Sequence, residues 1–357
     1  MRKPVGRRCS QDDRGFTLVE LLVSIAVLLL IMALLLSVTS QMGTLWRTTT
    51  AKIEQFRDAR EGFEAMTRRL SQATLNTYWD YDSPTAPTKY IRQSELRFIV
   101  GETETLAGAP AAPKRWPTYG VFFQAPLGFS EQTGSVGLEN LLNTWGYYIE
   151  FGDDSTQRPG IISTTIAPPR YRYRLMELME PSESLTLYKY TSGMPNYNGT
   201  EWFTTPLKAT LPMMHVLAEN VVALVILPKL GAQDEQNLEN AGTIPNAPIG
   251  TSLAPNYTYD STNPNVSNAA LNPKNQLPPE MQITMVAIDE ASAIRLAQTK
   301  GATMPDFGQG SLFADATKMA SDLKTLQDNL AAQHVTFHVF TTSVSIAGAK
   351  WSRAEKN

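Results

Sequence analysis

Residues 16–38 form an apolar run of 23 positions, and no other feature constrains the fold of this chain as strongly. The run is interrupted only by Thr17, Glu20, Ser24 and Ser37. A helix rises 1.5 Å per residue, so these residues extend about 34 Å, enough to cross the roughly 30 Å hydrocarbon core of a bilayer. We therefore expect a transmembrane helix at about 16–38.

Charge and the flanking sequence favour an anchor with an exported C-terminal part. The basic residues before the run are Arg2, Lys3, Arg7, Arg8 and Arg14. Because positive flanks stay in the cytoplasm, the remainder should cross the membrane. A secretory signal would end in small residues, and a twin-arginine signal is weakened by the polar residues 9–13. A lipoprotein signal would place Cys9 after the apolar run, not before it.

Glu20 places a carboxylate within the apolar run, where an ionisable group is costly and usually has a functional partner. If the chain were cut after Gly15, the new ammonium at Phe16 of one subunit could pair with Glu20 of its neighbour. The alternative is a carboxylate near the membrane surface that reaches water. Glu20 alone leaves both interpretations open.

Residues 14–20, RGFTLVE, resemble the processing site of type IV prepilins and pseudopilins, with a short basic leader at 1–15. The resemblance implies that a prepilin peptidase cleaves between Gly15 and Phe16 and methylates the Phe16 amine. It also implies that Glu20 guides assembly. The expected partners are other minor pilins or pseudopilins, an inner-membrane platform protein and an assembly ATPase.

Composition argues against broad nucleic-acid binding. The full chain has 31 basic and 34 acidic residues, and removal of residues 1–15 leaves 26 and 32, a net charge near −6. A chain of this charge lacks the basic surface that phosphate binding needs. Cys9 lies in the leader, so the mature chain could form no intramolecular disulfide.

Beyond the membrane, apolar spacing predicts that one helix continues to about residue 75, with Gly43 and Gly62 as candidate bend points. Residues 76–357 should form a β-rich exported domain, because two-residue alternation replaces the helical spacing. The fold class we expect is α+β and type IV pilin-like: a long N-terminal helix packed on an antiparallel sheet.

Several segments are candidates for the strands of that sheet. The alternating residues are Leu96, Phe98 and Val100; Tyr147, Ile149 and Phe151; Tyr171, Tyr173 and Leu175; Leu185 and Leu187; and Met281, Ile283, Met285 and Ala287. VVALVIL at 221–227 predicts a fully buried strand. We also expect a helix at about 313–333 and a last strand at 335–346.

Residues 228–280 should be a large loop insertion between two core strands, because eight prolines and nine asparagines favour turns over packed structure. The two interpretations are a mobile surface loop and a partner-specific surface.

The order of segments is similar to the J-type minor pseudopilins of type II secretion systems, and the long insertion departs from them. A finer resemblance is to the pilin-like cassette proteins of Verrucomicrobia. These similarities imply a non-enzymatic minor pilin or pseudopilin in a short fibre of a type II secretion or type IV pilus-like system. It would span the bacterial inner membrane once, with its C-terminal domain in the periplasm. The alternatives are a signal-anchored periplasmic enzyme or sugar-binding module, and a DNA-uptake minor pilin.

Few residue patterns indicate chemistry. No cofactor is expected, and calcium remains an open candidate. The three histidines are His215, His334 and His338; the last two would share a strand face, too far apart for easy metal binding. Calcium could use oxygen ligands that lack EF-hand spacing. These candidates are Asp153 and Asp154; Asp260 with Asn256 and Asn263; and Asp289 with Glu290.

Two aromatic segments complete the candidates. Tyr171-Arg172-Tyr173-Arg174 fits a half-buried strand with its arginines outward, and alternatively a surface that stacks nucleic-acid bases. The cluster of Tyr78, Trp79 and Tyr81 would seal the junction of helix and sheet, or else bind a sugar or a partner.

Overall fold

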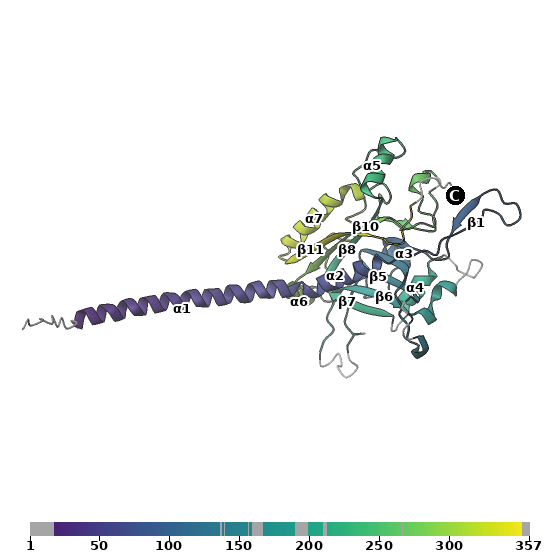
Figure 1. Ribbon diagram of the computed structural model, residues 1–357. Coiled ribbons are helices and arrows are strands. Elements are labelled where there is room, and N and C mark those ends of the chain that lie inside the picture. Colours follow the sequence, from purple (N-terminus) through teal and green to yellow (C-terminus); the bar gives the residue numbers. More distant parts are fainter. Residues whose placement is uncertain are drawn as a thin grey trace, which may run out of the picture. The chain divides into compact units, whose positions relative to one another are not determined.

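A computed structural model describes residues 18–135, 138, 140–155, 157–158, 167–189, 199–209, 213–265 and 267–351, without the side chains of residues 40, 41, 43–55 and 135. The chain divides into two compact units, residues 1–54 and 55–357. The second unit contains two sheets, the helices that cover them and an aromatic hairpin (Figure 1).

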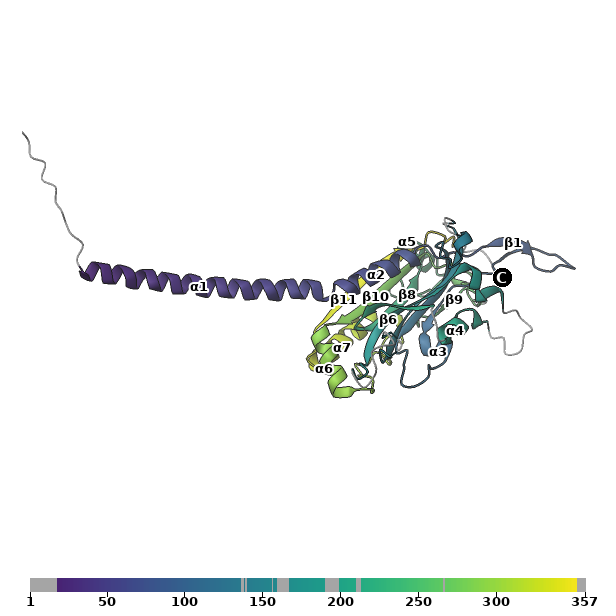
Figure 2. The same cartoon turned by 90° about the horizontal axis from the view of Figure 1, so that it is seen from below.

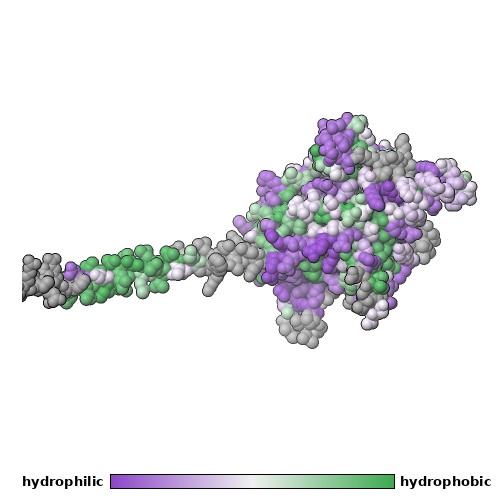
Figure 3. Space-filling model, viewed as in Figure 1, coloured by the Kyte–Doolittle hydropathy of each residue, from purple (hydrophilic) through white to green (hydrophobic). Residues whose placement is uncertain are grey.

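The first unit is dominated by helix α1, Leu18–Gln55. Its segment Leu18–Thr39 is long and apolar enough to cross a membrane. The apolar side chains of this segment are exposed, and they colour the helix as hydrophobic in Figure 3. The expected apolar helix is therefore present.

The expected single helix to residue 75 is divided in two. Phe56 leaves helical geometry, with φ −111° and ψ 11°, and helix α2 covers Arg57–Leu70. The interruption falls at neither Gly43 nor Gly62. The Phe56 ring packs on His338, with ring centroids 5.5 Å apart, so a tertiary contact accompanies the break. After Leu70 the chain becomes extended, because Thr74 N–H donates to the Gln124 carbonyl in strand β4 (Tyr119–Pro126).

A six-stranded antiparallel sheet forms one layer of the globular unit. Its strands in spatial order are β7 (Met214–Glu219), β6 (Arg172–Glu180), β5 (Leu142–Gly152), β4 (Tyr119–Pro126), β3 (Ile99–Glu102) and β9 (Tyr259–Asp260). Tyr147 and Ile149 of β5 and Leu175 of β6 share one buried cluster, as their alternation predicted. Leu96 belongs to a different cluster from Phe98 and Val100.

A three-stranded antiparallel sheet forms the second layer, in the order β11 (Phe337–Ser345), β10 (Glu280–Ile288) and β8 (Val221–Lys229). β8 contacts β4, β5 and β6, so the main core lies between the two sheets. All seven residues of VVALVIL are buried there, which confirms the predicted fully buried strand. The α+β class with antiparallel sheets is confirmed as well.

Helix α2 packs against β7, β11 and β4, and Figure 2 shows it lying along the strands. Its buried residues are Ala59, Gly62, Phe63, Met66 and Leu70. A Cβ at Gly62 would lie 3.1 Å from the Ala218 Cβ and 3.2 Å from the Leu217 carbonyl oxygen. Glycine therefore lets α2 approach the edge strand β7 closely.

The outer face of the six-stranded sheet carries a second apolar cluster. Phe122 stacks on Phe203 at 4.2 Å, and Phe203 comes from helix α4 (Glu201–Lys208). The short helix α3 (Thr103–Ala107) contributes Ala107. The expected strand at Leu185 and Leu187 is wrong, since this segment forms 3-10 turns at Ser182–Ser184 and Thr186–Tyr188 and buries Leu187 in the same cluster.

The insertion at 228–280 connects the neighbouring strands β8 and β10, as expected, but its described residues are packed. It contains helix α5 (Ala232–Asn240), strand β9 and a 3-10 turn at Ala269–Leu271. Leu230, Leu238, Ile244 and Ala270 form a small core of its own. Tyr257 and Tyr259 join the main core, so these parts of the insertion are packed, contrary to the expectation of turns over packed structure.

Two helices lie between strands β10 and β11 in the chain: α6 (Glu290–Lys300) and α7 (Met319–Ala332). The predicted helix at 313–333 thus begins six residues late, because Phe313 has a positive φ of 65° and Asp315 caps a separate 3-10 turn. Leu326 and Leu330 of α7 are buried, as their spacing predicted. Helix α6 had not been predicted.

Candidate functional site

The proposed processing site lies at the boundary of the described chain. Gly15 and Phe16 fall outside the described residues, which begin at Leu18. Glu20 occupies the first turn of α1, where a negative charge interacts favourably with the helix dipole. Its backbone carbonyl accepts a hydrogen bond of 2.7 Å from Ser24 Oγ. Two of the polar residues in the run thus lie one turn apart on the helix.

The surface around Glu20 is apolar and uncovered. Leu18, Leu21 and Leu22 are 77%, 54% and 58% exposed. Their exposure continues along the whole segment to Thr39, so the helix presents apolar side chains in every direction. A helix that is hydrophobic on all sides belongs in a membrane or between other helices. Either environment surrounds the Glu20 carboxylate with apolar groups.

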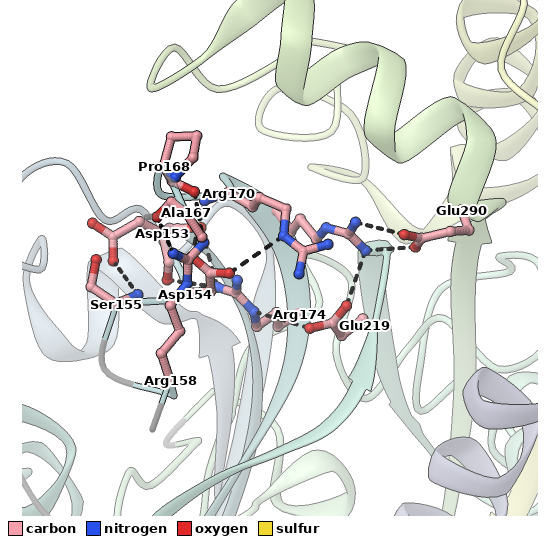
Figure 4. A network of polar contacts seen from close by, with 12 residues as sticks. Asp153, Asp154, Ser155, Arg158, Ala167, Pro168, Arg170, Arg174, Glu219 and Glu290 are labelled. Atoms are coloured by element: carbon pink, nitrogen blue, oxygen red, sulfur yellow. Dashed lines mark hydrogen bonds and ion pairs between the residues drawn. The ribbon is translucent and has the colours of Figure 1, made fainter. Parts of the chain in front are cut away.

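The arginines of the Tyr171-Arg172-Tyr173-Arg174 segment are buried, so the expectation that they point outward to solvent is wrong. Arg172 binds Glu290 in a bidentate manner, at 2.5 and 2.6 Å, and Glu219 at 3.0 Å (Figure 4). The hydrogen bonds that Arg172 donates to Glu290 raise the Arg172 pKa, against the opposing effect of burial. These arginines face away from the main core, as alternation requires, but loops and carboxylates cover them.

Arg174 is fully buried and donates to the carbonyls of Gly152 and Asp153 at 3.1 and 2.9 Å. Its Nε lies 3.8 Å from Glu219. Burial lowers its pKa. Because neither arginine is exposed on a flat aromatic surface, the segment does not provide a platform for stacked bases.

The acidic residues considered for calcium are engaged by protein donors. Asp154 binds Arg158 at 2.8 Å (Figure 4), Asp260 accepts from Thr262 N–H at 2.8 Å, and Asp289 caps helix α6 through Ser292 N–H. Glu290 binds Arg172. Within the described residues, no three His, Cys, Asp or Glu side chains are arranged to hold a metal ion.

The three histidines lie in different environments. His215 is exposed on β7. His334 precedes β11 with φ 55°, so it does not share a strand face with His338 as expected. His338 lies in β11 next to two aromatic rings, 5.5 Å from Phe56 and 4.6 Å from Phe340.

The aromatic cluster of Tyr78, Trp79 and Tyr81 does not seal the junction of helix and sheet. It lies on a hairpin of β1 (Tyr78–Tyr81) and β2 (Tyr90–Gln93) that projects from the globular unit in Figures 1 and 2. The three rings are 44–57% exposed. The Arg92 guanidinium carbon lies 5.5 Å from the centroid of the Trp79 ring. Tyr81 stacks on Tyr90, with ring centroids 4.9 Å apart. Trp79 and Tyr81 therefore pack against residues of the same hairpin.

Comparison with known proteins identifies the N-terminal segment. The family described as "Prokaryotic N-terminal methylation motif" matches residues 11–36. No curated protein and no solved structure matches the chain. The motif and the apolar helix that overlaps it are consistent with a type IV pilin-like protein, and a motif of this kind implies processing by a prepilin peptidase and pilin assembly.

Proposed function

We propose that this chain is a minor pilin or pseudopilin subunit that assembles into a short fibre of a type II secretion or type IV pilus-like system. The methylation motif at 11–36, together with the exposed apolar segment Leu18–Thr39 that overlaps it, carries the proposal. A processed subunit of this kind is held in the membrane by α1 until neighbouring helices replace the lipid around it.

The proposed processing step supplies a positive charge that can pair with Glu20. Cleavage between Gly15 and Phe16 frees an ammonium four residues before Glu20. In a fibre, the Phe16 ammonium of one subunit pairs with the Glu20 carboxylate of its neighbour, and this pairing offsets the cost of removing both charges from water. The positive-inside rule places the N-terminus in the cytoplasm and the sheet unit in the periplasm.

The role we propose is structural, with no catalytic step. The arginines and carboxylates of β6, β7 and α6 bind one another, which supports a role in packing. The partners are a prepilin peptidase, other minor subunits, an inner-membrane platform protein and an assembly ATPase.

Intact mass and N-terminal sequencing of the membrane-extracted protein test this function. We expect a chain that begins at N-methylated Phe16. Gly15→Leu should leave the leader uncut, because the glycine precedes the bond to be cleaved, whereas Ser10→Ala, outside the matched motif, should be processed normally. A mature chain that begins at Met1, or after Ser37, would contradict the proposal and favour a plain anchor or a secreted protein.

A further inference from the structure

Strand β11 forms one edge of the three-stranded sheet (Figure 1). Its nine residues pair with β10 in an unbroken register. Backbone groups alternate sides along a strand, so half of them face β10 and half face away from the sheet. At the two ends, Asp289 N–H donates to the Thr336 carbonyl and Ile346 N–H donates to the Pro279 carbonyl. The even-numbered residues of β11 therefore face β10, and the odd-numbered residues face outward.

The outward groups of β11 have no hydrogen-bond partner in the part of the chain that the structure describes. Five residues direct an N–H and a carbonyl to this side: Phe337, Val339, Thr341, Ser343 and Ser345. The outward positions just beyond them are closed, because Val335 N–H donates to the Leu330 carbonyl and Ala347 N–H donates to the Ser71 carbonyl. Thr341, Ser343 and Ser345 are exposed. An open stretch of donors and acceptors thus remains between two closed ends.

The other three sheet edges are protected. Strand β9 is only two residues long, and β8 is buried along 221–228 against the six-stranded sheet. Helix α2 comes close to the backbone of β7, where a Cβ at Gly62 would lie 3.2 Å from the Leu217 carbonyl oxygen. On β11, by contrast, α2 packs against the rings of His338 and Phe340.

Strand β11 also lacks the sequence features that protect an exposed edge. Such edges usually carry charged residues, prolines or bulges, which prevent pairing with another strand. The sequence of β11, FHVFTTSVS, contains no Asp, Glu, Lys, Arg or Pro, and its pairing with β10 has no register shift. It is therefore a regular nine-residue edge that can accept a further strand.

The chemistry of this edge fits an extended backbone. Its outward N–H and carbonyl groups repeat at the spacing of a strand, and another extended chain presents complementary groups at the same spacing. Because β11 has no Asp, Glu, Lys or Arg, nothing in the strand selects an acidic or a basic segment. Thr341 and Ser343 favour β-branched and small polar residues opposite them.

A second copy of this chain is disfavoured as the occupant. Helix α2 and β11 run in the same direction, because Phe56 packs on His338 near the start of β11 and Ser71 binds Ala347 just beyond its end. Two copies of β11 related by a two-fold axis would pair antiparallel. Their α2 helices would then begin at opposite ends of the paired strands. Since α2 directly follows α1, two chains anchored in the same membrane by α1 do not fit this arrangement.

We propose that the outer edge of β11 binds an extended strand of a different protein subunit, which adds one strand to the three-stranded sheet. The proposal rests on the assembly function above and names the contact that the globular unit makes there. The partner's backbone donates to and accepts from the outward residues of β11, and its alternate side chains lie over the two faces of the sheet. Such a contact joins unlike surfaces, as an open fibre requires.

Photocrosslinking in the native host tests the contact, with p-benzoylphenylalanine in place of Ser345, an exposed residue of the open edge. We expect an adduct with a different protein. Ser343→Pro removes one outward N–H and leaves the bonds to β10 in place. It should lower the adduct yield at least about tenfold, because a carbonyl of the partner loses its donor. Ser343→Ala is the matched control, since it removes the same hydroxyl and keeps the N–H.

Ser343→Lys is a second test that leaves every backbone group intact. A charge on an edge strand opposes pairing, so this variant should also lower the adduct yield. Ser321→Lys is its control, because Ser321 is exposed on α7, away from the edge. Protease resistance equal to that of the natural chain shows which variants keep a folded globular unit.

An adduct only with lipid or with a second copy of this chain would overturn the proposal. So would no adduct, or a yield that the folded Pro and Lys variants leave unchanged, or an equal loss on Ser343→Ala. The N-terminal residue is determined in the same sample. A chain that lacks methylated Phe16 would contradict the assembly function, whereas a methylated chain without the expected adduct would overturn only the strand pairing.

Discussion

Glu180 is a buried carboxylate at the end of strand β6. Thr186 N–H donates to its Oε1 at 2.9 Å, and the hydroxyl of Thr186 lies 3.3 Å from its Oε2. Burial raises the Glu180 pKa to about 7, although the bonds from Thr186 oppose this effect. The unfolded chain releases this proton at a lower pH, so the folded state binds more protons between about pH 4.5 and 7.

The free energy of unfolding should therefore fall as pH rises through this window, with the loss complete above about pH 7. Glu180→Gln keeps an acceptor for Thr186 N–H and removes the titration. We expect the variant to match the natural chain near pH 4.5 and to exceed its stability at pH 8 by at most about 3 kcal/mol. Denaturant unfolding of both proteins in the same detergent measures this difference. An equal difference at both pH values would contradict the prediction.

The sequence identifies single residues well where a local motif fixes their role. Glu20 stands out because it interrupts an apolar run, and this signal needs no tertiary structure. Arg172 and Arg174 were misjudged, because alternation correctly assigns them to the outer face but cannot show that Glu219 and Glu290 cover that face. No sequence pattern singled out Asn220, because its burial depends on how β7, β8 and α6 pack together.

The strongly periodic elements were predictable, and the segments stabilised by distant contacts were not. Strand β8 is apolar at every position of 221–227, so a fully buried strand is its simplest interpretation. The insertion was misjudged because its prolines and asparagines are typical of loops. Its packing depends on Glu235, whose buried carboxylate accepts from the backbone of Gly250 and Ser252, 15 and 17 residues later.

A substitution at Leu230 tests whether the insertion is a packed element. It is 1% exposed in the small core with Leu238. Leu230→Ala should destabilise this region by about 2–5 kcal/mol through lost burial and a cavity. Ile249→Ala is the control within the same insertion, because Ile249 is 54% exposed. Limited proteolysis should cut the Leu230 variant faster within 231–279 and leave the control unchanged. Equal cleavage of both variants would indicate that the insertion opens freely.

At the scale of the whole molecule, the two compact units differ in how much of each can be inferred from local sequence patterns. The segment at 11–36 is matched by a family motif, and its function follows from a short local pattern. The unit at 55–357 is built from two sheets, and its core brings together residues far apart in the chain. The ring centroids of Phe63 and Phe340, for example, lie 5.7 Å apart. Its class could be predicted, but its two-layer arrangement could not, because single strands do not specify their partners.

Glu20 distinguishes two interpretations of the N-terminal helix: one in which its carboxylate pairs with a neighbouring subunit during assembly, and one in which it only reaches water at the membrane surface. If its carboxylate pairs with the Phe16 ammonium of a neighbour, Glu20→Gln removes one partner of a buried pair, at a cost of about 3–5 kcal/mol. Incorporation into fibres should then fall by about a hundredfold or more, while cleavage after Gly15 and membrane insertion continue. Ser24→Ala, one turn further along α1, is the control.

The measurement is the ratio of this chain in sheared or purified fibres to that in membranes, with the N-terminal residue determined in both fractions. A carboxylate that only reaches water at the membrane surface predicts no loss on Glu20→Gln, because an amide at that position is easier to bury than a charge. Unchanged incorporation would therefore exclude the ion pair and leave the apolar helix alone to direct assembly. A loss restored by Glu20→Asp would support charge pairing, since the shorter side chain keeps the negative charge.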